Sequence, residues 1–372
     1  MYKTSKRVLA IIMAAAMAAG SSSLVMAADE ASVNVDTRQA AENNTWEMAG
    51  DPSGYKLHCY WPAPDTFFDS YVLEGLEAFE EDYGVDIDWM VGTEWTQDIE
   101  NQSVEAKIAE GYDLFLIFGA DTSGANALYQ EIYDAGGQVV NYAGLMDDPQ
   151  QSAATLASDV YVQAYNSAKN LIGLMGEEGE IINVLENLSD VNTQKRQQGV
   201  EDAVAEYENV SIAQTVADIA TVDEGYEKIS DALTANAGVK GIITTGGTSS
   251  QGLANALSDY YGTNPDAEHI FAGSMDQSNE VMSAIENGEI DYTVAQNGWA
   301  MGYVSSLILC MLKDGWEANE FGEFIDTGYI FINKDNAETW QADIEAKAAE
   351  LIGSLETDWF KKLNKEYQVF IL

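Results

Sequence analysis

Apolar runs of strand length alternate with longer stretches of helical spacing from about residue 55 onward. The first helical stretches stop at Gly84, Gly111 and Gly136, where a residue that tolerates positive φ closes a helix. A strand–helix–strand rhythm at this spacing predicts a parallel sheet with right-handed crossovers. The expected strands are residues 55–61, 85–91, 113–118 and 138–142, and the expected helices are residues 68–83, 97–110 and 123–135.

The same rhythm restarts near residue 160 and continues to residue 312. Two α/β units of similar plan are therefore predicted, rather than one long sheet. The expected strands are residues 180–185, 210–216, 239–244, 269–273 and 292–295, and the expected helices are residues 160–175, 193–207, 222–236, 249–260, 277–287 and 298–312.

The two ends of the chain do not share this rhythm. Residues 1–28 combine a basic start, a short apolar run and small residues at a cleavage position, which is typical of a signal peptide. The apolar run is too short to span a bilayer. Residues 29–54 predict a flexible leader, and the acidic tail from residue 333 has helical spacing over residues 342–355 but no predicted place. We expect an exported protein, in the periplasm or at the extracellular face of the membrane.

Charge and cysteine content narrow the classes of function. The chain holds 62 acidic and 17 basic residues, for a formal net charge of −45. A field of that sign repels nucleic acids and anionic lipid surfaces. Cys59 and Cys310 are the only cysteines, and each lies in an apolar run. An exported chain could pair them, but the apolar context favours two buried free thiols.

The loops that follow the predicted strands contain the candidate site residues. In open parallel sheets, ligands bind beyond the carboxyl ends of the strands. These loops are rich in carboxylates, amides and aromatic rings, a combination that suits a neutral polyol. Each residue taken alone could instead be a helix cap or a turn residue. The candidates are Asp65, Phe67, Phe68, Asp121, Asn192, Gln194, Thr248, Asp276, Gln296 and Trp299.

The sequence gives less support to a catalytic site or a metal site. His58 and His269 lie inside predicted strands and far apart in sequence, which predicts core histidines rather than a catalytic triad. The segment from Asp190 to Gln194 resembles the start of a calcium loop, but Lys195 stands where that loop needs glycine. We predict no catalytic residue, no cofactor and no metal. A carboxylate pair for glycoside hydrolysis remains open, so a secreted carbohydrate-active enzyme is one alternative.

Several stretches, in the right order, resemble a known family. The chain is similar from about residue 55 to residue 332 to the type I periplasmic binding proteins, the sugar-binding components of ABC importers related to the ribose-binding protein. The stretches are APDTFFDSYVLEGLEAFEEDYGVDI, GYDLFLIFGADTSG, TQKRQQGVEDAV, GVKGIITTGGTSSQGLANAL and IFAGSMDQSNEVMSAIENGEIDYTVAQNGWAMGY.

This resemblance implies two Rossmann-like lobes joined by a three-segment hinge, with crossings near residues 156, 293 and 325. The N-terminal lobe would be residues 55–155 plus 294–325, and the C-terminal lobe residues 156–293 plus 326–372. The implied function is capture of a small neutral solute, a sugar or sugar derivative, by a monomer that delivers it to an ABC permease. A sensor for a chemoreceptor or kinase would share this fold and site, and is a second alternative.

Carried over by position, the resemblance implies roles for individual residues. Phe67 and Phe68 would be aromatic walls of the cleft, and Asp65 stands where the family often has a sugar-binding Asn. Asp276 and Gln296 match polar ligand contacts. Trp61 and Trp299 would add to the aromatic surface.

Three departures leave the ligand open. The family's sugar-clamping Arg falls on Gln194, its ligand-binding Asn falls on Gly246, and its Asp-Arg pair reads Ala143-Gly144. A bidentate Arg clamp cannot become Gln without changing the ligand's orientation. The resemblance therefore implies the fold but does not identify a pentose or a hexose.

Overall fold

The computed structural model describes residues 45–64, 67–188 and 190–363. The predicted signal peptide, leader residues 29–44 and the candidate Asp65 lie outside the described residues.

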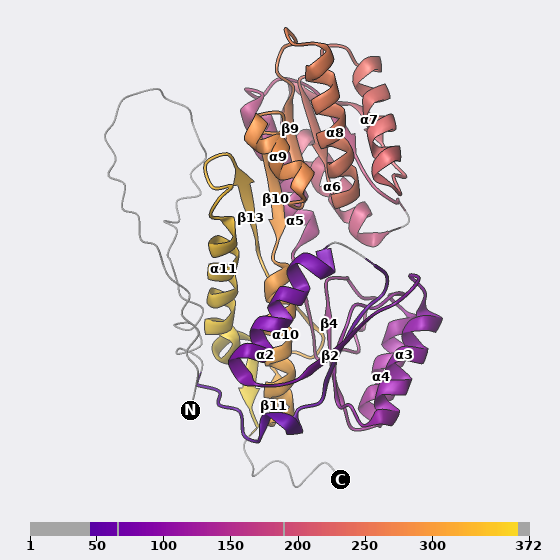
Figure 1. Cartoon of the computed structure of the whole chain (residues 1–372), viewed down its shortest axis with the longest axis vertical. Coiled ribbons are helices and arrows are strands. Elements are labelled where there is room, and N and C mark those ends of the chain that lie inside the picture. The colour runs from indigo at the N-terminus through magenta and orange to yellow at the C-terminus, as the bar shows by residue number, and fades with distance from the viewer. Residues whose placement is uncertain (1–44, 65–66, 189, 364–372) are drawn as a thin grey trace, which may run out of the picture. The chain divides into compact units, whose positions relative to one another are not determined.

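The first lobe, which contains β2 and β4 in Figure 1, is built on a six-stranded sheet. The order of its strands is β12-β5-β4-β3-β1-β2. All five pairings in it are parallel. The strand order reverses between β1 and β3, which makes their carboxyl ends a topological switch point. The strands are β1 (Leu57–Trp61), β2 (Ile87–Val91), β3 (Leu114–Ile117), β4 (Gln138–Tyr142), β5 (Ala154–Ala157) and β12 (Glu323–Asp326).

Helices cover both faces of this sheet. One face carries the continuous segment η2–α2 with α10 and α11, and the other carries α3 and α4. Gly84 and Gly111 cap α2 and α3 at φ of 71° and 88°, which confirms the predicted helix ends. Gly136 follows α4 with φ of 86°. The helices are η2 (Phe68–Val72), α2 (Leu73–Tyr83), α3 (Gln97–Glu110), α4 (Gly124–Asp134), α10 (Gly298–Lys313) and α11 (Trp340–Ser354).

Helices α2 and α10 cross at two glycines. A Cβ on Gly75 would lie 2.1 Å from the carbonyl oxygen of Trp299, and a Cβ on Gly302 would lie 2.3 Å from that of Val72. Backbones this close leave no room for a side chain at either position. The crossing holds the start of α10 against the segment that leaves β1, where the candidate aromatic residues lie.

The second lobe repeats the plan with the order β13-β10-β9-β8-β6-β7, and its strand order reverses between β6 and β8. Only the edge strand β13 is antiparallel, to β10. Helices α5 and α6 pack together in one apolar cluster, and α7, α8 and α9 in another. The elements are β6 (Gly179–Val184), β7 (Val210–Val216), β8 (Gly241–Thr244), β9 (Phe271–Met275), β10 (Tyr292–Gln296), β13 (Tyr329–Asn333), α5 (Val160–Leu174), α6 (Val191–Ala205), α7 (Val222–Ala235), α8 (Gly247–Thr263) and α9 (Asn279–Asn287).

The predicted fold class, two α/β lobes with largely parallel sheets, is confirmed. The sequence pattern missed five strands: β5, β12, β13 and the small pair β11 (Trp316–Ala318) with β14 (Phe360–Lys362). These strands have three to five residues each. A run that short carries too little periodicity to be distinguished from a loop.

Three segments connect the two sheets. The chain leaves β5 at Ser158, leaves β10 at Asn297 and leaves β12 at Thr327, a few residues beyond the crossings that the resemblance implied. All three side chains are buried. The Ser158 hydroxyl bonds the carbonyl of Gly328 at 2.7 Å, and the Asn297 amide donates to the carbonyl of Thr327 at 3.0 Å. The crossing segments are therefore hydrogen-bonded to one another.

The C-terminal segment contributes to the first lobe. Ala348, Ile352 and Leu355 belong to the same buried cluster as Leu57 and Leu116. The resemblance implied that residues 326–372 belong to the second lobe, and β13 does pair there with β10. Helix α11 contacts both lobes, because it packs on α10 as well as on β13.

Part of the predicted flexible leader is also packed. Trp46 is 7% exposed, and its indole nitrogen donates to the Asp314 carboxylate at 3.0 Å. The last residues of the leader, from Thr45, therefore belong to the first lobe's packed structure.

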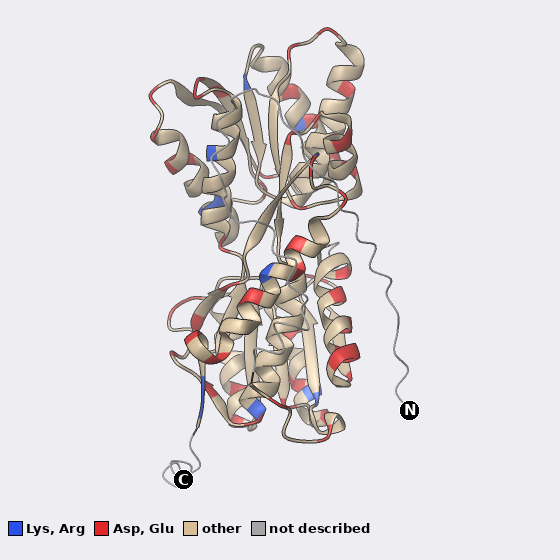
Figure 2. Cartoon of the chain, turned by 90° about the vertical axis from the view of Figure 1, so that its left-hand side faces the viewer, with Lys and Arg blue, Asp and Glu red and all other residues tan. Residues whose placement is uncertain are grey.

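Acidic residues are spread over both lobes and basic residues are few (Figure 2). Both cysteines are buried and unpaired. Burial raises the pKa of the Cys59 thiol to about 12. Within residues 45–363, none of the described helices combines the length and apolar content that crossing a bilayer requires.

Candidate ligand-binding site

Aromatic rings gather at the switch point of the first lobe. Trp61, the last residue of β1, is 2% exposed, and its ring centroid lies 4.8 Å from that of Phe118 and 6.2 Å from that of Phe67. Phe68 is fully buried beneath Trp61, at 5.4 Å between centroids. The resemblance implied that Phe68 would wall the cleft, but the structure places it in the core because the helical segment turns it inward. Phe67 and Phe118 are half-buried and keep part of their surface accessible.

Phe67 faces the start of α10. Its ring lies 5.6 Å from that of Tyr71, one helical turn later. A Cβ on Gly298 would lie 3.0 Å from the Phe67 ring and 2.8 Å from the Tyr71 Cβ. Trp299, half-buried, stacks on Tyr303 at 4.5 Å with an interplanar angle of 15°. The glycine at the first position of α10 thus lets Phe67 and Tyr71 lie close to this helix.

The second lobe places Asp276 and Gln296 together, as a shared site requires. Gln296 donates from Nε2 to Asp276 Oδ1 at 2.9 Å. Asp276 lies just after β9 with φ of 62°, and its backbone N–H and C=O bond Val294 and Thr293 of the neighbouring strand β10. A positive φ in a non-glycine residue is sparsely populated and clusters at functional sites. The backbone pairing therefore holds the Asp276 carboxylate at the strand exit.

Sequence reasoning missed Glu186, a second carboxylate at this switch point. It follows β6 and accepts a hydrogen bond at Oε1 from the Ser249 N–H, 3.0 Å away, in the first turn of α8. A Cβ on Gly246 would lie 2.3 Å from the Glu186 carboxyl carbon, and one on Gly247 would lie 3.0 Å from Asp276 Oδ2. The double glycine therefore lets two carboxylates approach the helix N-terminus, where the helix dipole stabilises negative charge. In the sequence, the pair Gly246-Gly247 was the feature that could have pointed to this close approach.

A hydrogen bond between Tyr71 and Gln277 joins the two lobes near this site. The Tyr71 hydroxyl donates to the carbonyl oxygen of Gln277, 2.9 Å away. Burial, and next the nearby Asp276 charge, raise the pKa of Tyr71 above its ordinary value. Tyr71, Gln277, Gln296 and Trp299 also border a free space of about 40 Å³. That space is too small for a sugar ring. No sequence pattern predicted that Tyr71 and Gln277 would pair, because the two residues are 206 positions apart in the chain.

Two of the remaining candidates, Asp121 and Gln194, form hydrogen bonds with residues close to them in sequence. Asp121 accepts hydrogen bonds from the N–H groups of Ser123 and Gly124 and so closes a turn before α4. Gln194 is exposed on α6 and donates to the carbonyl of Leu188 at 2.9 Å. Asn192, on α6, and Thr248, in the first turn of α8, are half-buried. Asp190 caps α6.

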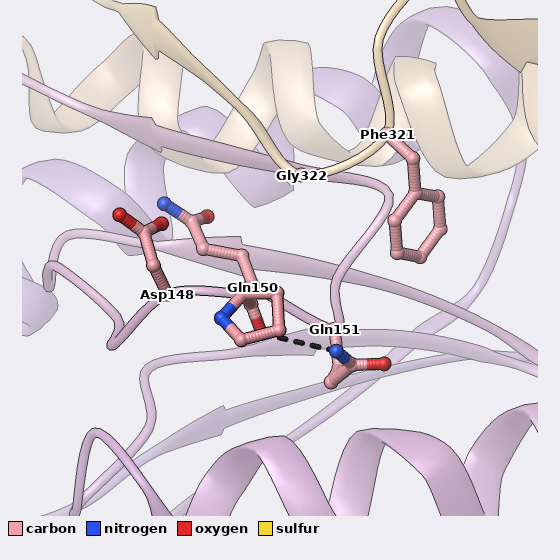
Figure 3. A pocket seen from close by; sticks show the side chains of 6 residues that line it. Asp148, Gln150, Gln151, Phe321 and Gly322 are labelled. Carbon is pink, nitrogen blue, oxygen red and sulfur yellow. Dashed lines mark hydrogen bonds between the residues drawn. The ribbon is translucent and has the colours of Figure 1, made fainter.

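Another hollow, with a volume of about 630 Å³, lies away from these residues. The segments that line it precede β5 and β12, so it lies at the amino ends of these strands. Its walls are formed by Asp148, Pro149, Gln150, Gln151, Phe321 and Gly322 (Figure 3). Among the predicted site residues that the structure describes, none lines this hollow.

The two histidines lie in different environments, and each lies beside an aspartate. His58 is buried on β1, its Nδ1 lies 2.6 Å from Asp88 Oδ2, and burial lowers its pKa. His269, predicted to be in the core, is instead exposed because it precedes β9, and its Nε2 lies 3.1 Å from Asp291. In the described part of the chain, no cluster of three or more His, Cys, Asp or Glu residues is arranged to hold a metal ion.

Comparison with known proteins decides the family. The model of the periplasmic binding protein domain matches residues 60–316, which include the switch points of both lobes. The chain belongs to this family. The sequence-based prediction of a type I periplasmic binding protein is thereby confirmed.

A curated relative is similar over part of its length. The D-apiose import binding protein of Actinobacillus succinogenes is 29% identical over 150 residues, which is 40% of this chain and 46% of that protein. The chain thus spans about half the length of this curated relative.

Solved structures share the fold. A solute-binding protein of Burkholderia graminis in complex with D-arabinose has a TM-score of 0.70 at 18% identity, covering 78% of this chain and 99% of that one. A solute-binding protein of Bacillus halodurans with bound myo-inositol has a TM-score of 0.66 at 17% identity, covering 79% and 100%. At this identity the likeness shows the fold alone.

Proposed function

We propose that this protein is an extracytoplasmic solute-binding protein that captures a small neutral solute, a sugar or sugar derivative, between its lobes. The observation that carries the proposal is the family match across both switch points. A relative named for D-apiose import and fold neighbours holding D-arabinose and myo-inositol support the same class of ligand.

The chemistry of the strand-exit loops supports a ligand without negative charge. No lysine or arginine occurs in residues 62–67, 92–96, 118–123, 185–190, 217–221 or 276–278. Glu186 and Asp276 carry carboxylates there, which would repel an anionic sugar phosphate or acid. Carboxylates and amides accept and donate hydrogen bonds to hydroxyls, while Phe67 offers a ring face to C–H groups.

Capture would work by approach of the two lobes. A ligand stabilises the closed state of the two lobes only if it binds that state more tightly than the open state. It does so when both lobes contact the ligand in the closed state. Phe67 would supply contacts from the first lobe, Asp276 and Thr248 from the second, and Gln296 from the end of β10 beside a crossing segment. The buried hydrogen bonds among Ser158, Asn297 and Thr327 would keep those segments together during the movement.

The remaining roles follow from this class of protein. The protein would make and break no covalent bond and would need no cofactor. After export by the segment at residues 1–28, the loaded monomer would deliver its ligand to the permease of an ABC importer.

A thermal-shift screen followed by calorimetry tests the proposal. D-apiose, D-arabinose and myo-inositol are the first probes, with ribose 5-phosphate as the charged control. A ligand at 100 times its Kd stabilises the folded state by about 2.7 kcal/mol. The unfolding entropy grows with chain length, so in a protein of this size the same stabilisation raises Tm by roughly 4 °C. A stabilising neutral sugar with no turnover supports the proposal. Absence of any shift across neutral sugars and polyols, or release of a cleaved product, would refute it.

A further inference from the structure

Trp95, in the loop between β2 and α3, presents an exposed aromatic ring beside the switch point. Its side chain is 48% exposed, whereas Trp61 at the end of β1 is 2% exposed. Its ring packs edge-on against Phe118, at 4.9 Å and 86°. Tryptophan is enriched at binding interfaces because its large apolar ring can be covered by a ligand or partner while its N–H keeps a hydrogen bond.

Hydrogen bonds between two loops fix this ring in place. The Trp95 indole nitrogen donates to the Ala120 carbonyl at 2.9 Å, and the Ala120 N–H donates to the buried Glu100 carboxylate at 2.6 Å. The Asp121 N–H donates to Gln97 at 3.1 Å. The loop after β2 and the loop after β3 are thus joined, so binding a ligand would not have to order Trp95.

The ring continues the aromatic series of the proposed site. Phe118, which supports Trp95, also packs edge-on against Trp61 at 4.8 Å and 71°. Trp61 in turn contacts Phe67. Trp95 therefore lies at the outer end of a row of rings that begins at Phe67. Glu94 and Thr96 on either side of it are exposed and polar.

We propose that Trp95, supported by Phe118, is a second stacking platform that takes the second ring of an oligosaccharide or glycoside. This inference rests on the proposed function, because it assumes that the first ring binds near Phe67. A flat indole face covers the apolar C–H face of a sugar ring, and the neighbouring polar groups suit its hydroxyls. The preferred ligand is then larger than a monosaccharide.

The test compares single sugars with disaccharides built from them. Arabinose with arabinobiose, xylose with xylobiose and galactose with galactobiose are titrated into the wild type, Trp95→Ala and Trp95→Phe. The measured quantity is the ratio of disaccharide affinity to monosaccharide affinity. We expect Trp95→Ala to lower this ratio about 3- to 10-fold, with an intermediate loss for Trp95→Phe.

Trp89→Ala is the matched control. Trp89 is 46% exposed on the same lobe but lies within β2, before the strand exit, so its replacement should leave the ratio unchanged. Tryptophan fluorescence gives a readout that needs no destabilising change. The difference spectrum between wild type and Trp95→Phe should respond to the disaccharide more than to the monosaccharide.

Each other outcome has a separate meaning. If Trp95→Ala leaves the ratio of disaccharide to monosaccharide affinity unchanged, the platform is overturned. The same holds if both affinities fall equally, because the ratio is then unchanged. Monosaccharide binding in either case still supports the proposed function. A wild type that binds no saccharide of either length overturns the proposed function and the platform together.

Discussion

The Gln296 amide donates a hydrogen bond to the Asp276 carboxylate, 2.9 Å away, across the ends of two neighbouring strands. Twenty residues separate the pair in sequence. Their side chains meet because β9 and β10 are parallel neighbours, which brings both carboxyl ends to one edge of the sheet. This pairing makes Asp276 and Gln296 the best-defined polar pair of the candidate site.

Removing either partner should weaken ligand binding. We expect Asp276→Ala and Gln296→Ala each to lower the affinity for the stabilising sugar by about tenfold or more, since each removes a hydrogen bond to the ligand or to its partner. Asp276→Ala should also cost about 1–2 kcal/mol of stability, because alanine tolerates the positive φ poorly. Asp276→Asn should keep the fold, because asparagine tolerates that conformation. Calorimetry gives the affinities and urea unfolding gives the stabilities.

Asp291→Asn is the control for that pair. Asp291 lies at the amino end of β10 and accepts a hydrogen bond from the Ala272 N–H at 2.7 Å, away from the strand exits. Its replacement should leave affinity unchanged. Equal affinities in wild type, Asp276→Ala and Gln296→Ala would remove both residues from the site.

The hydrogen bond between the lobes should contribute to the bound state. Tyr71→Phe removes the hydroxyl that donates to the Gln277 carbonyl and keeps the ring. A hydrogen bond of this kind is worth about 1 kcal/mol, so affinity should fall about fivefold, mainly through faster dissociation. Tyr226→Phe removes a hydroxyl bonded to Asp259 within the second lobe and should not change affinity. Stopped-flow dissociation rates that are the same for Tyr71→Phe and wild type would contradict the role.

The crossing of α2 and α10 should not accept side chains. Gly75→Ala and Gly302→Ala place a Cβ within 2.4 Å of backbone oxygen atoms, which cannot move aside as the end of a side chain could. We expect each to lose about 2–3 kcal/mol of stability. At Gly262, in the last turn of α8, nothing lies within 4 Å of an added Cβ, so Gly262→Ala should be neutral or slightly stabilising. Unfolding midpoints in urea measure the difference, and three equal midpoints would argue against the close crossing.

Glu100 should make stability depend on pH. Burial raises the pKa of its carboxyl to about 7, against 4.5 in an exposed chain. Between pH 4.5 and 7 the folded state therefore binds more protons than the unfolded state. The stabilisation that the folded state gains from protonated Glu100 is complete below pH 4.5 and is lost as pH rises through 7. It amounts to up to about 3 kcal/mol. Glu100→Gln, which does not titrate, should lose less stability than wild type between pH 4.5 and 7.5. Parallel stability curves for the two proteins would show that Glu100 does not titrate there.

Local patterns in the sequence were enough for most elements of the fold. Strands β4 and β7 and helix α3 have the bounds that alternation and helical spacing predict, and Gly84 and Gly111 end helices as expected. These features depend on neighbours within about ten residues, so the sequence alone contains them. The candidate loops followed from the same patterns, because parallel sheets bring their carboxyl ends together.

Tertiary packing decided which residues in those loops remain accessible. Phe67 and Phe68 are adjacent and chemically identical, yet only Phe67 keeps exposed surface, because consecutive positions of a helical segment point about 100° apart. Glu186, Tyr71 and Gln277 entered the site through contacts between residues far apart in the chain. The sequence by itself determined two α/β lobes and the loops at their strand exits. Only the tertiary structure, through burial and long-range hydrogen bonds, decided which side chains at those exits face a ligand.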